Sequence, residues 1–261
     1  MSLANCNKSE HDTPAFGVPK PSPEGTLRPL GSGPALACVR VSSPMLVIHD
    51  VHVSIQSVVA LRGMSLTVAD GTMVGLVGRN GAGKTTLMRS VMGHLEPSQG
   101  SISFDGQDLA KLPRHARANL GIGYMPEDRG LVPELTVEEN ILLPVWVNKA
   151  LKQDERLALV YRVLPELIEM KDRRALLLSG GQQKLVALAR ALAVGTRLLL
   201  LDEPFEGVAP ALSMRLADVI ASLKGSAVSV LMAQSDLNHS RKLVDAEFVI
   251  ERGTNRVSQA A

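Results

Sequence analysis

The chain has 261 residues, of which 45% are apolar, so it can bury a sizeable hydrophobic core. Its 28 lysines and arginines against 26 aspartates and glutamates give a net charge of +2, which favours neither a nucleic acid nor an anionic membrane surface as partner. One tryptophan, two tyrosines and four phenylalanines are too few for a base-stacking platform, so we expect no nucleic-acid partner. No apolar run approaches the roughly 18 to 20 residues of a membrane-spanning helix.

The N-terminal stretch, residues 1–44, is rich in proline, glycine and serine and has no apolar periodicity. Because such a composition cannot bury a core, it predicts a disordered tail, either a regulatory arm or an extension without effect on the chemistry. The start also lacks the basic cluster and apolar core of a secretory signal, so we expect the protein to remain in the cytoplasm. A folded domain is predicted over residues 45–261.

From Met45 onward, short apolar segments alternate with turn residues, which indicates β-strands. Strands are predicted over residues 45–53, 61–68, 73–77 and 102–104, and a helix after Gly83. Residues 134–192 are predicted to be mostly helical, with one helix opening at Glu138 and another over 183–193. The remainder alternates strands at 197–201, 227–233 and 247–251 with helices at 210–223 and 236–243.

The run Leu198–Leu201 is apolar on both faces, which suits the centre of a parallel sheet covered by helices on both sides. The predicted fold class is therefore α/β, a nucleotide-binding core with a parallel sheet and a helical insertion at about residues 134–192. Trp146, within that insertion, is expected to belong to its core, with a contact to a membrane partner as the alternative.

The strand ending at Val77 leads into a segment that fits the phosphate-loop pattern of strand, glycine-rich loop and helix. Its residues are Gly78, Arg79, Asn80, Gly81, Ala82, Gly83, Lys84, Thr85 and Thr86. The glycines let backbone N–H groups curl around a phosphate, and the helix that begins near Lys84 directs its positive dipole end toward the same place. We expect Lys84 to approach the β- and γ-phosphates and Thr85 to bind Mg²⁺.

Two carboxylates, Asp202 and Glu203, follow the apolar strand 198–201, at the end where ligands bind in open α/β sheets. We expect Asp202 to hold Mg²⁺ through water and Glu203 to orient or deprotonate the water that attacks the γ-phosphate. By itself, an apolar strand that ends in Asp-Glu is often followed only by a turn. The phosphate loop upstream in the sequence favours the catalytic interpretation.

Between these motifs stands the segment Leu178-Ser179-Gly180-Gly181-Gln182-Gln183, and with it the chain resembles the ATP-binding subunits of ABC transporters over about residues 46–252. The resemblance implies a P-loop NTPase core with an antiparallel β subdomain and the helical insertion. It further implies that Ser179, Gly180, Gly181 and Gln182 contact the γ-phosphate held by the phosphate loop of a second subunit, so that ATP joins two subunits. Simple capping of a helix is the alternative for this segment.

The same resemblance implies the partners. These are a second ATP-binding subunit, identical or related, transmembrane permease subunits and, indirectly, an extracytoplasmic solute-binding protein. ATP and Mg²⁺ are the implied cofactors, and the implied location is peripheral, on the cytoplasmic face of the inner membrane. Coupling to the permease would run through the loop around Glu127 and the helical insertion.

Local details resemble the branch of the family that serves branched-chain amino acid or urea uptake. The stretches that carry this likeness are Met125-Pro126-Glu127-Asp128-Arg129, Leu135-Thr136-Val137-Glu138-Glu139-Asn140 and Glu203-Pro204-Phe205-Glu206-Gly207-Val208-Ala209-Pro210. We therefore expect an importer of branched-chain amino acids or of a related small polar solute.

Three positions depart from the wider family. Glu127 stands where glutamine is usual; it can still meet Mg²⁺ or its water, but it adds negative charge near the γ-phosphate. Gln234 stands at the position of a switch histidine; it can donate a hydrogen bond to phosphate but carries no charge. Ile55 replaces the aromatic ring that stacks on adenine, so we expect weak base selectivity.

These departures leave an alternative function open, that of a nucleotide-gated regulatory or interaction module with negligible turnover. Glu203 argues against this alternative, and Gln234 and Ile55 argue weakly for it. A soluble ABC-type ATPase of DNA repair or translation is a third candidate, but the chain shows neither a second cassette nor a long coiled-coil insertion.

Overall fold

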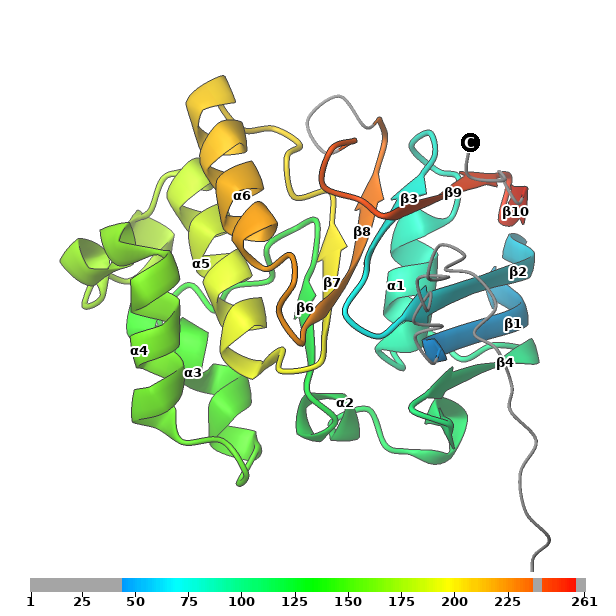
Figure 1. Cartoon of the computed structure of the whole chain (residues 1–261), viewed down its shortest axis with the longest axis horizontal. Coiled ribbons are helices and arrows are strands. Elements are labelled where there is room, and N and C mark those ends of the chain that lie inside the picture. Colours follow the sequence, from blue (N-terminus) through cyan, green and yellow to red (C-terminus); the bar gives the residue numbers. More distant parts are fainter. Residues whose placement is uncertain (1–43, 237–240, 257–261) are drawn as a thin grey trace, which may run out of the picture. The chain divides into compact units, whose positions relative to one another are not determined.

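The computed structural model describes residues 44–236 and 241–256, which build two β-sheets and the helices packed on them (Figure 1). Apart from Pro44, the predicted tail lies outside the described residues. The helix predicted over 236–243 lies partly outside them as well, and the described residues 241–243 form a turn instead. Among the described residues no helix is both long and apolar enough to cross a bilayer.

An antiparallel sheet has the strand order β2-β1-β4-β5. Its strands are β1 (Pro44–Ile55), β2 (Val58–Ala69), β4 (Gln99–Phe104) and β5 (Gln107–Asp108). The pairing of β1 is irregular around Asp50, whose φ of 48° is positive. Gly100 passes this irregularity so closely that a Cβ atom there would lie 2.2 Å from the Asp50 carbonyl oxygen. The bend in β1 therefore requires glycine on β4.

The larger sheet has the order β10-β9-β3-β8-β7-β6, and all its pairs are parallel except β9 with β10. Its strands are β3 (Met73–Val77), β6 (Ile122–Met125), β7 (Leu198–Asp202), β8 (Ser229–Gln234), β9 (Ala246–Glu251) and β10 (Thr254–Arg256). The predicted α/β class with a central parallel sheet is thus confirmed. Because β3, β7 and β8 run in parallel, their carboxyl ends meet at one edge.

The helices lie on both faces of this sheet (Figure 1). They are α1 (Lys84–Val91), α2 (Ala116–Asn119), α3 (Val137–Val147), α4 (Gln153–Val163), α5 (Gly180–Val194) and α6 (Pro210–Ser222), with 3₁₀ turns at Leu109–Lys111, Pro165–Met170 and Ala175–Leu177. Alternate residues of β7 divide the core. Leu199 and Leu201 pack toward α3–α6, whereas Leu198 and Leu200 pack toward α1 and the antiparallel sheet. Burial on both faces explains the uninterrupted apolar run.

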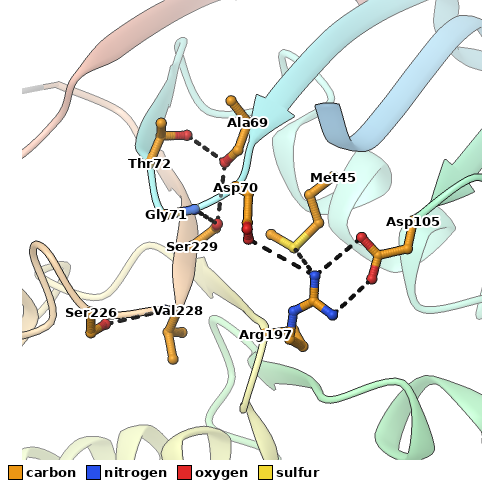
Figure 2. Close-up of polar contacts among 10 residues, drawn as sticks. All are labelled: Met45, Ala69, Asp70, Gly71, Thr72, Asp105, Arg197, Ser226, Val228 and Ser229. Atoms are coloured by element: carbon orange, nitrogen blue, oxygen red, sulfur yellow. Dashed lines mark hydrogen bonds and ion pairs between the residues drawn. The ribbon is translucent and has the colours of Figure 1, made fainter. Parts of the chain in front are cut away.

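Polar contacts join the two sheets at the start of β7, at the edge opposite the carboxyl ends (Figure 2). The Arg197 guanidinium pairs with Asp105 at 3.0 Å and approaches Asp70 at 3.9 Å. Nearby, the Ser229 hydroxyl accepts a hydrogen bond from the Gly71 N–H over 2.7 Å and donates one to the Ala69 carbonyl over 3.2 Å. These contacts are structural and leave the opposite edge of the sheet for ligands.

Candidate functional site

The glycine-rich loop follows β3, and its conformation depends on the glycines of the motif. A Cβ atom on Gly78 would lie 2.3 Å from the carbonyl oxygen of Ile250, so no larger residue fits there. Gly81 and Gly83 have φ values of 80° and 112°, in the region that favours glycine. Gly83 caps α1 without a side-chain hydrogen bond, so the backbone N–H groups of the first helical turn stay available for an anion.

Lys84 joins the phosphate loop to the carboxylate pair. Its ammonium group donates to the carbonyl oxygens of Gly78 and Arg79 over 2.5 and 3.2 Å, and lies 3.0 Å from Oε1 of Glu203. The lysine is only 4% exposed. The structure therefore brings together the phosphate loop and the carboxylate pair, which are far apart in sequence, with a buried ion pair between them.

Asp202 ends β7 as a fully buried carboxylate. Its Oδ2 accepts a long hydrogen bond of 3.4 Å from the Tyr124 hydroxyl, while Oδ1 has no hydrogen-bond donor among the described residues. Burial above all raises the pKa of Asp202 to about 6, and the carboxylates of Glu127 and Glu203 act in the same direction. An orphaned, buried carboxylate oxygen is the kind of group that a divalent cation satisfies.

Two further oxygen atoms lie beside Asp202. The Thr85 hydroxyl donates to Oε2 of Glu127 over 3.4 Å, and its proximity to Asp202 lowers the pKa of that carboxylate. One hydroxyl and two carboxylates fit the hard oxygen ligands of Mg²⁺. No group of three or more His, Cys, Asp or Glu side chains that could hold a metal occurs within residues 44–236 and 241–256. Phosphate oxygens and water would therefore have to complete the coordination shell.

Glu203 is held where β7 and β8 end. Its backbone has a φ of 47°, and its N–H donates to the Ala233 carbonyl. Its carboxylate accepts hydrogen bonds from the hydroxyl and the backbone N–H of Ser235, over 2.8 and 3.2 Å. Gln234, the predicted switch residue, is buried at the end of β8, and its carbonyl accepts the Gly78 N–H over 3.0 Å. The backbone of the predicted switch residue thus touches the start of the phosphate loop.

The loop after β6 connects Glu127 to the helix that begins at Gly180. Arg129 donates to Oε1 of Gln183 over 3.0 Å, and its guanidinium lies against Gly180. Arg190, on the same helix, donates to the carbonyls of Arg129 and Gly130, each over 2.6 Å. A displacement of this loop therefore reaches α5 directly.

The predicted signature segment forms the start of α5. Ser179 caps the helix in a reciprocal arrangement with Gln182, since each side chain accepts the backbone N–H of the other. A Cβ atom on Gly181 would lie 2.7 Å from Cδ2 of Leu212, so a larger residue there would require the Leu212 side chain to shift. Ser179 and Gly180 are exposed. In the described part of the chain, no hydrogen bond or ion pair joins this segment to residues 78–86.

Three cavities of about 280, 310 and 550 Å³ surround the phosphate loop. The smallest lies between Asn80, Glu203 and residues 234–236, the next beside Thr85 and Glu127, and the largest between residues 78–82 and 249–252. Ile55, at the end of β1, is 43% exposed and offers only an aliphatic face.

Sequence reasoning missed several residues of the site, namely Tyr124, Arg129, Lys184, Arg190 and Ser235. Lys184 is buried and donates to the Glu206 carbonyl over 2.5 Å, which ties α5 to the loop after β7. Burial lowers the pKa of Lys184. Only Arg129 and Ser235 carried a sequence signal, because one lies within a motif and the other next to Gln234. Trp146 is 50% exposed, so the expectation that it belongs to the core is wrong.

Comparison with known proteins agrees with this geometry. Residues 61–206 match the family model described as ABC transporter. The chain is 35% identical over 194 residues to the high-affinity branched-chain amino acid transport ATP-binding protein BraG of Pseudomonas aeruginosa, covering 74% of this chain and 83% of BraG. It is also 35% identical over 192 residues to the lipopolysaccharide export system ATP-binding protein LptB of Haemophilus influenzae, covering 73% and 80%.

Solved structures give the same fold. A nucleotide-free ATP-binding cassette from an ABC transporter superposes with a TM-score of 0.70 at 26% identity, covering 81% of this chain and 89% of that one. A dimeric post-hydrolysis cassette bound to ADP and Pi superposes with a TM-score of 0.73 at 22% identity, covering 81% and 97%. With its phosphate loop, buried carboxylate pair and signature helix, the chain belongs to the ABC transporter family, as an ATP-binding subunit that hydrolyses ATP.

Proposed function

We propose that this chain powers an importer of branched-chain amino acids, or of a related small polar solute, by ATP-driven dimerisation. The observation that carries the ATPase chemistry is the buried contact of 3.0 Å between Lys84 and Glu203, beside the orphaned oxygen of Asp202. A lysine, a water-orienting carboxylate and a metal-binding carboxylate in one place are the components of in-line phosphoryl transfer.

Each residue has a role in this proposal. The backbone N–H groups of residues 78–86 and the Lys84 ammonium bind the phosphates. Thr85, Asp202 and Glu127 would hold Mg²⁺, and the bound ion would supply positive charge against the negative charge that develops on the phosphate. Glu203 orients the attacking water, and Gln234 donates a hydrogen bond to the γ-phosphate. The alternative of a module with negligible turnover is disfavoured by the buried Glu203 and by the family to which the chain belongs.

The proposed dimer places the signature segment of one subunit over the nucleotide of the other. Ser179 and Gly180 are exposed at the helix start, and no contact in the described residues occupies them with the phosphate loop of their own chain. Ser179, Gly180, Gly181 and Gln182 would supply donors to the γ-phosphate in trans. The second subunit is either identical or a related chain.

The permease is proposed to dock in a groove of about 820 Å³. The loop after β6, α3 and α5 line it, with Asp128, Leu143, Val147 and Arg190 among the lining residues. Leu143, Trp146 and Val147 expose apolar surface on α3, next to the loop that carries Glu127. This groove would place the protein at the cytoplasmic face of the membrane, with an extracytoplasmic solute-binding protein as an indirect partner.

Two candidate transporters remain, an importer of amino acids and an exporter of lipopolysaccharide, and they differ in the molecule that is moved. The stretches 125–129, 135–140 and 203–210 and the likeness to BraG support amino acid import. LptB proteins match at 34–35% identity, which supports an exporter like that of LptB as a second candidate. Within either transporter, we propose residues 1–44 as the tail and 45–261 as the ATP-binding domain, with the helical insertion at about 134–192.

Uptake of radiolabelled leucine by cells that lack the gene tests the importer proposal. Wild-type protein should restore uptake, and Lys84→Ala should not, because the phosphates lose their main cationic contact. Unchanged uptake in the deletion strain, together with reduced lipopolysaccharide at the cell surface, would reject the importer and support the second candidate.

A further inference from the structure

Ser235 follows β8 directly and contacts both the catalytic carboxylate Glu203 and the phosphate-loop residue Asn80. Its hydroxyl lies 2.8 Å from Oε1 of Glu203 and 2.7 Å from Oδ1 of Asn80, and its backbone N–H lies 3.2 Å from Oε2 of Glu203. We propose that Ser235 is a positioning residue for ATP hydrolysis, which fixes the orientation of the Glu203 carboxylate and links it to the phosphate loop. This inference rests on the proposed role of Glu203.

The contact is a two-point clamp. A backbone N–H and a side-chain hydroxyl of one residue bind the two different oxygens of the carboxylate, so the carboxylate can neither rotate nor withdraw without breaking a hydrogen bond. The Glu203 backbone, at a φ of 47°, is held by its N–H bond to Ala233 on the same strand β8. Both the backbone and the side chain of Glu203 are thus positioned by the end of β8.

The clamp gains importance when nucleotide binds. In the present structure Lys84 also approaches Oε1 of Glu203, at 3.0 Å. Once the ammonium group turns toward phosphate oxygens, this ion pair weakens, and the two donors of Ser235 remain within hydrogen-bond distance of the carboxylate. A general base must keep its orientation while the water attacks the γ-phosphate, because small misplacements lower turnover strongly.

The hydroxyl also connects Glu203 with the nucleotide-binding loop. A serine hydroxyl carries a single proton, so it donates to Asn80 or to Glu203 at any moment, not to both. Asn80 belongs to the phosphate loop and lines the cavity between residues 78–82 and 249–252. If a bound nucleotide moved Asn80 away, the Ser235 hydroxyl would donate its proton to Glu203 alone. Nucleotide binding at the phosphate loop would thereby strengthen the hydrogen bond that orients the carboxylate.

Steady-state hydrolysis by the full-length chain tests the inference with Ser235→Ala, Ser235→Thr and Ser229→Ala. Ser235→Ala should lower kcat about tenfold, the effect of losing a hydrogen bond to a charged group, and change KM for ATP less than about twofold. Ser235→Thr keeps the hydroxyl and should restore kcat. Ser229→Ala removes a hydroxyl with two hydrogen bonds at the other end of β8, so it should lower the thermal midpoint but not kcat.

A wild-type kcat in Ser235→Ala, or a Thr variant as impaired as the Ala variant, would overturn the inference. Glu203→Gln measured alongside separates this failure from that of the proposed chemistry. If Glu203→Gln is inactive and Ser235→Ala is fully active, the results reject only the positioning role of Ser235. If Glu203→Gln is active, they reject the proposed role of Glu203, and the inference about Ser235 fails with it.

Discussion

At the scale of one residue, the burial of Asp202 destabilises the metal-free protein and at the same time provides a ligand for a cation. The carboxylate is fully buried, one of its oxygens lacks a donor among the described residues, and burial raises its pKa to about 6. A charge in such a place opposes folding until a cation balances it. The residue is therefore a strained element of the metal-free protein and a ready ligand for Mg²⁺.

We expect Asp202→Asn to stabilise the metal-free protein and to abolish Mg²⁺-dependent hydrolysis. The pKa of Asp202 rises from 3.8 to about 6 on folding, so the folded state binds the proton more tightly, and the free energy of unfolding falls as the pH rises between these values. About two pKa units correspond to at most about 3 kcal/mol at pH 8. Urea unfolding in EDTA should show the variant more stable by about 1 to 3 kcal/mol at pH 8, and the difference should shrink toward pH 4. A variant less stable than wild type at pH 8 would contradict this.

Individual residues differed in how far the sequence could predict them. The glycines of the phosphate loop were predictable because their spacing follows from the backbone, as the close approach of Gly78 to Ile250 shows. The clamp of Ser235 on Glu203 was not, since it joins residues 32 positions apart through the pairing of β7 and β8. Contacts of this kind depend on which strands are neighbours in the sheet, and a local sequence pattern does not determine that order.

At the scale of elements, the start of α3 explains the Leu135–Asn140 stretch. Thr136 and Glu139 form a reciprocal cap, and Asn140 is fully buried. The Asn140 side chain accepts from the Val132 N–H, and the two protons of its NH2 group are shared among the carbonyls of Val132, Leu135 and Thr136. The stretch therefore shapes a turn and a helix, so its residues have a structural role besides their likeness to one branch of the family.

Asn140→Ala should destabilise the protein by about 2 to 4 kcal/mol, because it leaves buried backbone groups without partners. Urea unfolding measures this change. Glu134→Ala, an exposed substitution in the same turn, should remain within about 0.5 kcal/mol of wild type. Equal stability of the two variants would contradict the structural role of Asn140.

The exposed face of α3 gives a second prediction at this scale. Val147 is 61% exposed and lines the large groove, so Val147→Glu should abolish co-purification with the permease and leave basal hydrolysis unchanged. Ile168→Glu, at an apolar residue with 49% exposure in a 3₁₀ turn, is the matched control and should not affect co-purification. Retained co-purification of Val147→Glu would place the docking site elsewhere.

Most of the longer elements were predictable from apolar periodicity, and β6 is an example of one that was not. Its four residues include Gly123, which weakens any strand pattern. A Cβ atom there would lie 2.2 Å from the Ala191 carbonyl, so the glycine allows α5 to pack closely on the sheet. Gly123 is thus required by the close packing of α5 on the sheet, and its presence made the strand before Glu127 unrecognisable from the sequence.

At the scale of the whole molecule, the parts of the site are divided between two cores. The phosphate loop joins α1, which packs with the antiparallel sheet, whereas the signature segment begins α5 in the helical core. Arg129 and Arg190 bind the loop after β6 to α5, which gives nucleotide and signature segment a mechanical connection. A complete site nevertheless needs the signature segment of another subunit, and this is the central claim of the proposed mechanism.

The most direct test is the mass of the Glu203→Gln variant in solution, measured by light scattering with saturating ATP and Mg²⁺. Loss of the water-orienting carboxylate leaves the phosphate contacts intact, so the variant should accumulate as an ATP-bound dimer and return to a monomer without nucleotide. Adding Lys84→Ala should keep it monomeric throughout. A Glu203→Gln protein that binds ATP but stays monomeric at saturation would contradict the shared site.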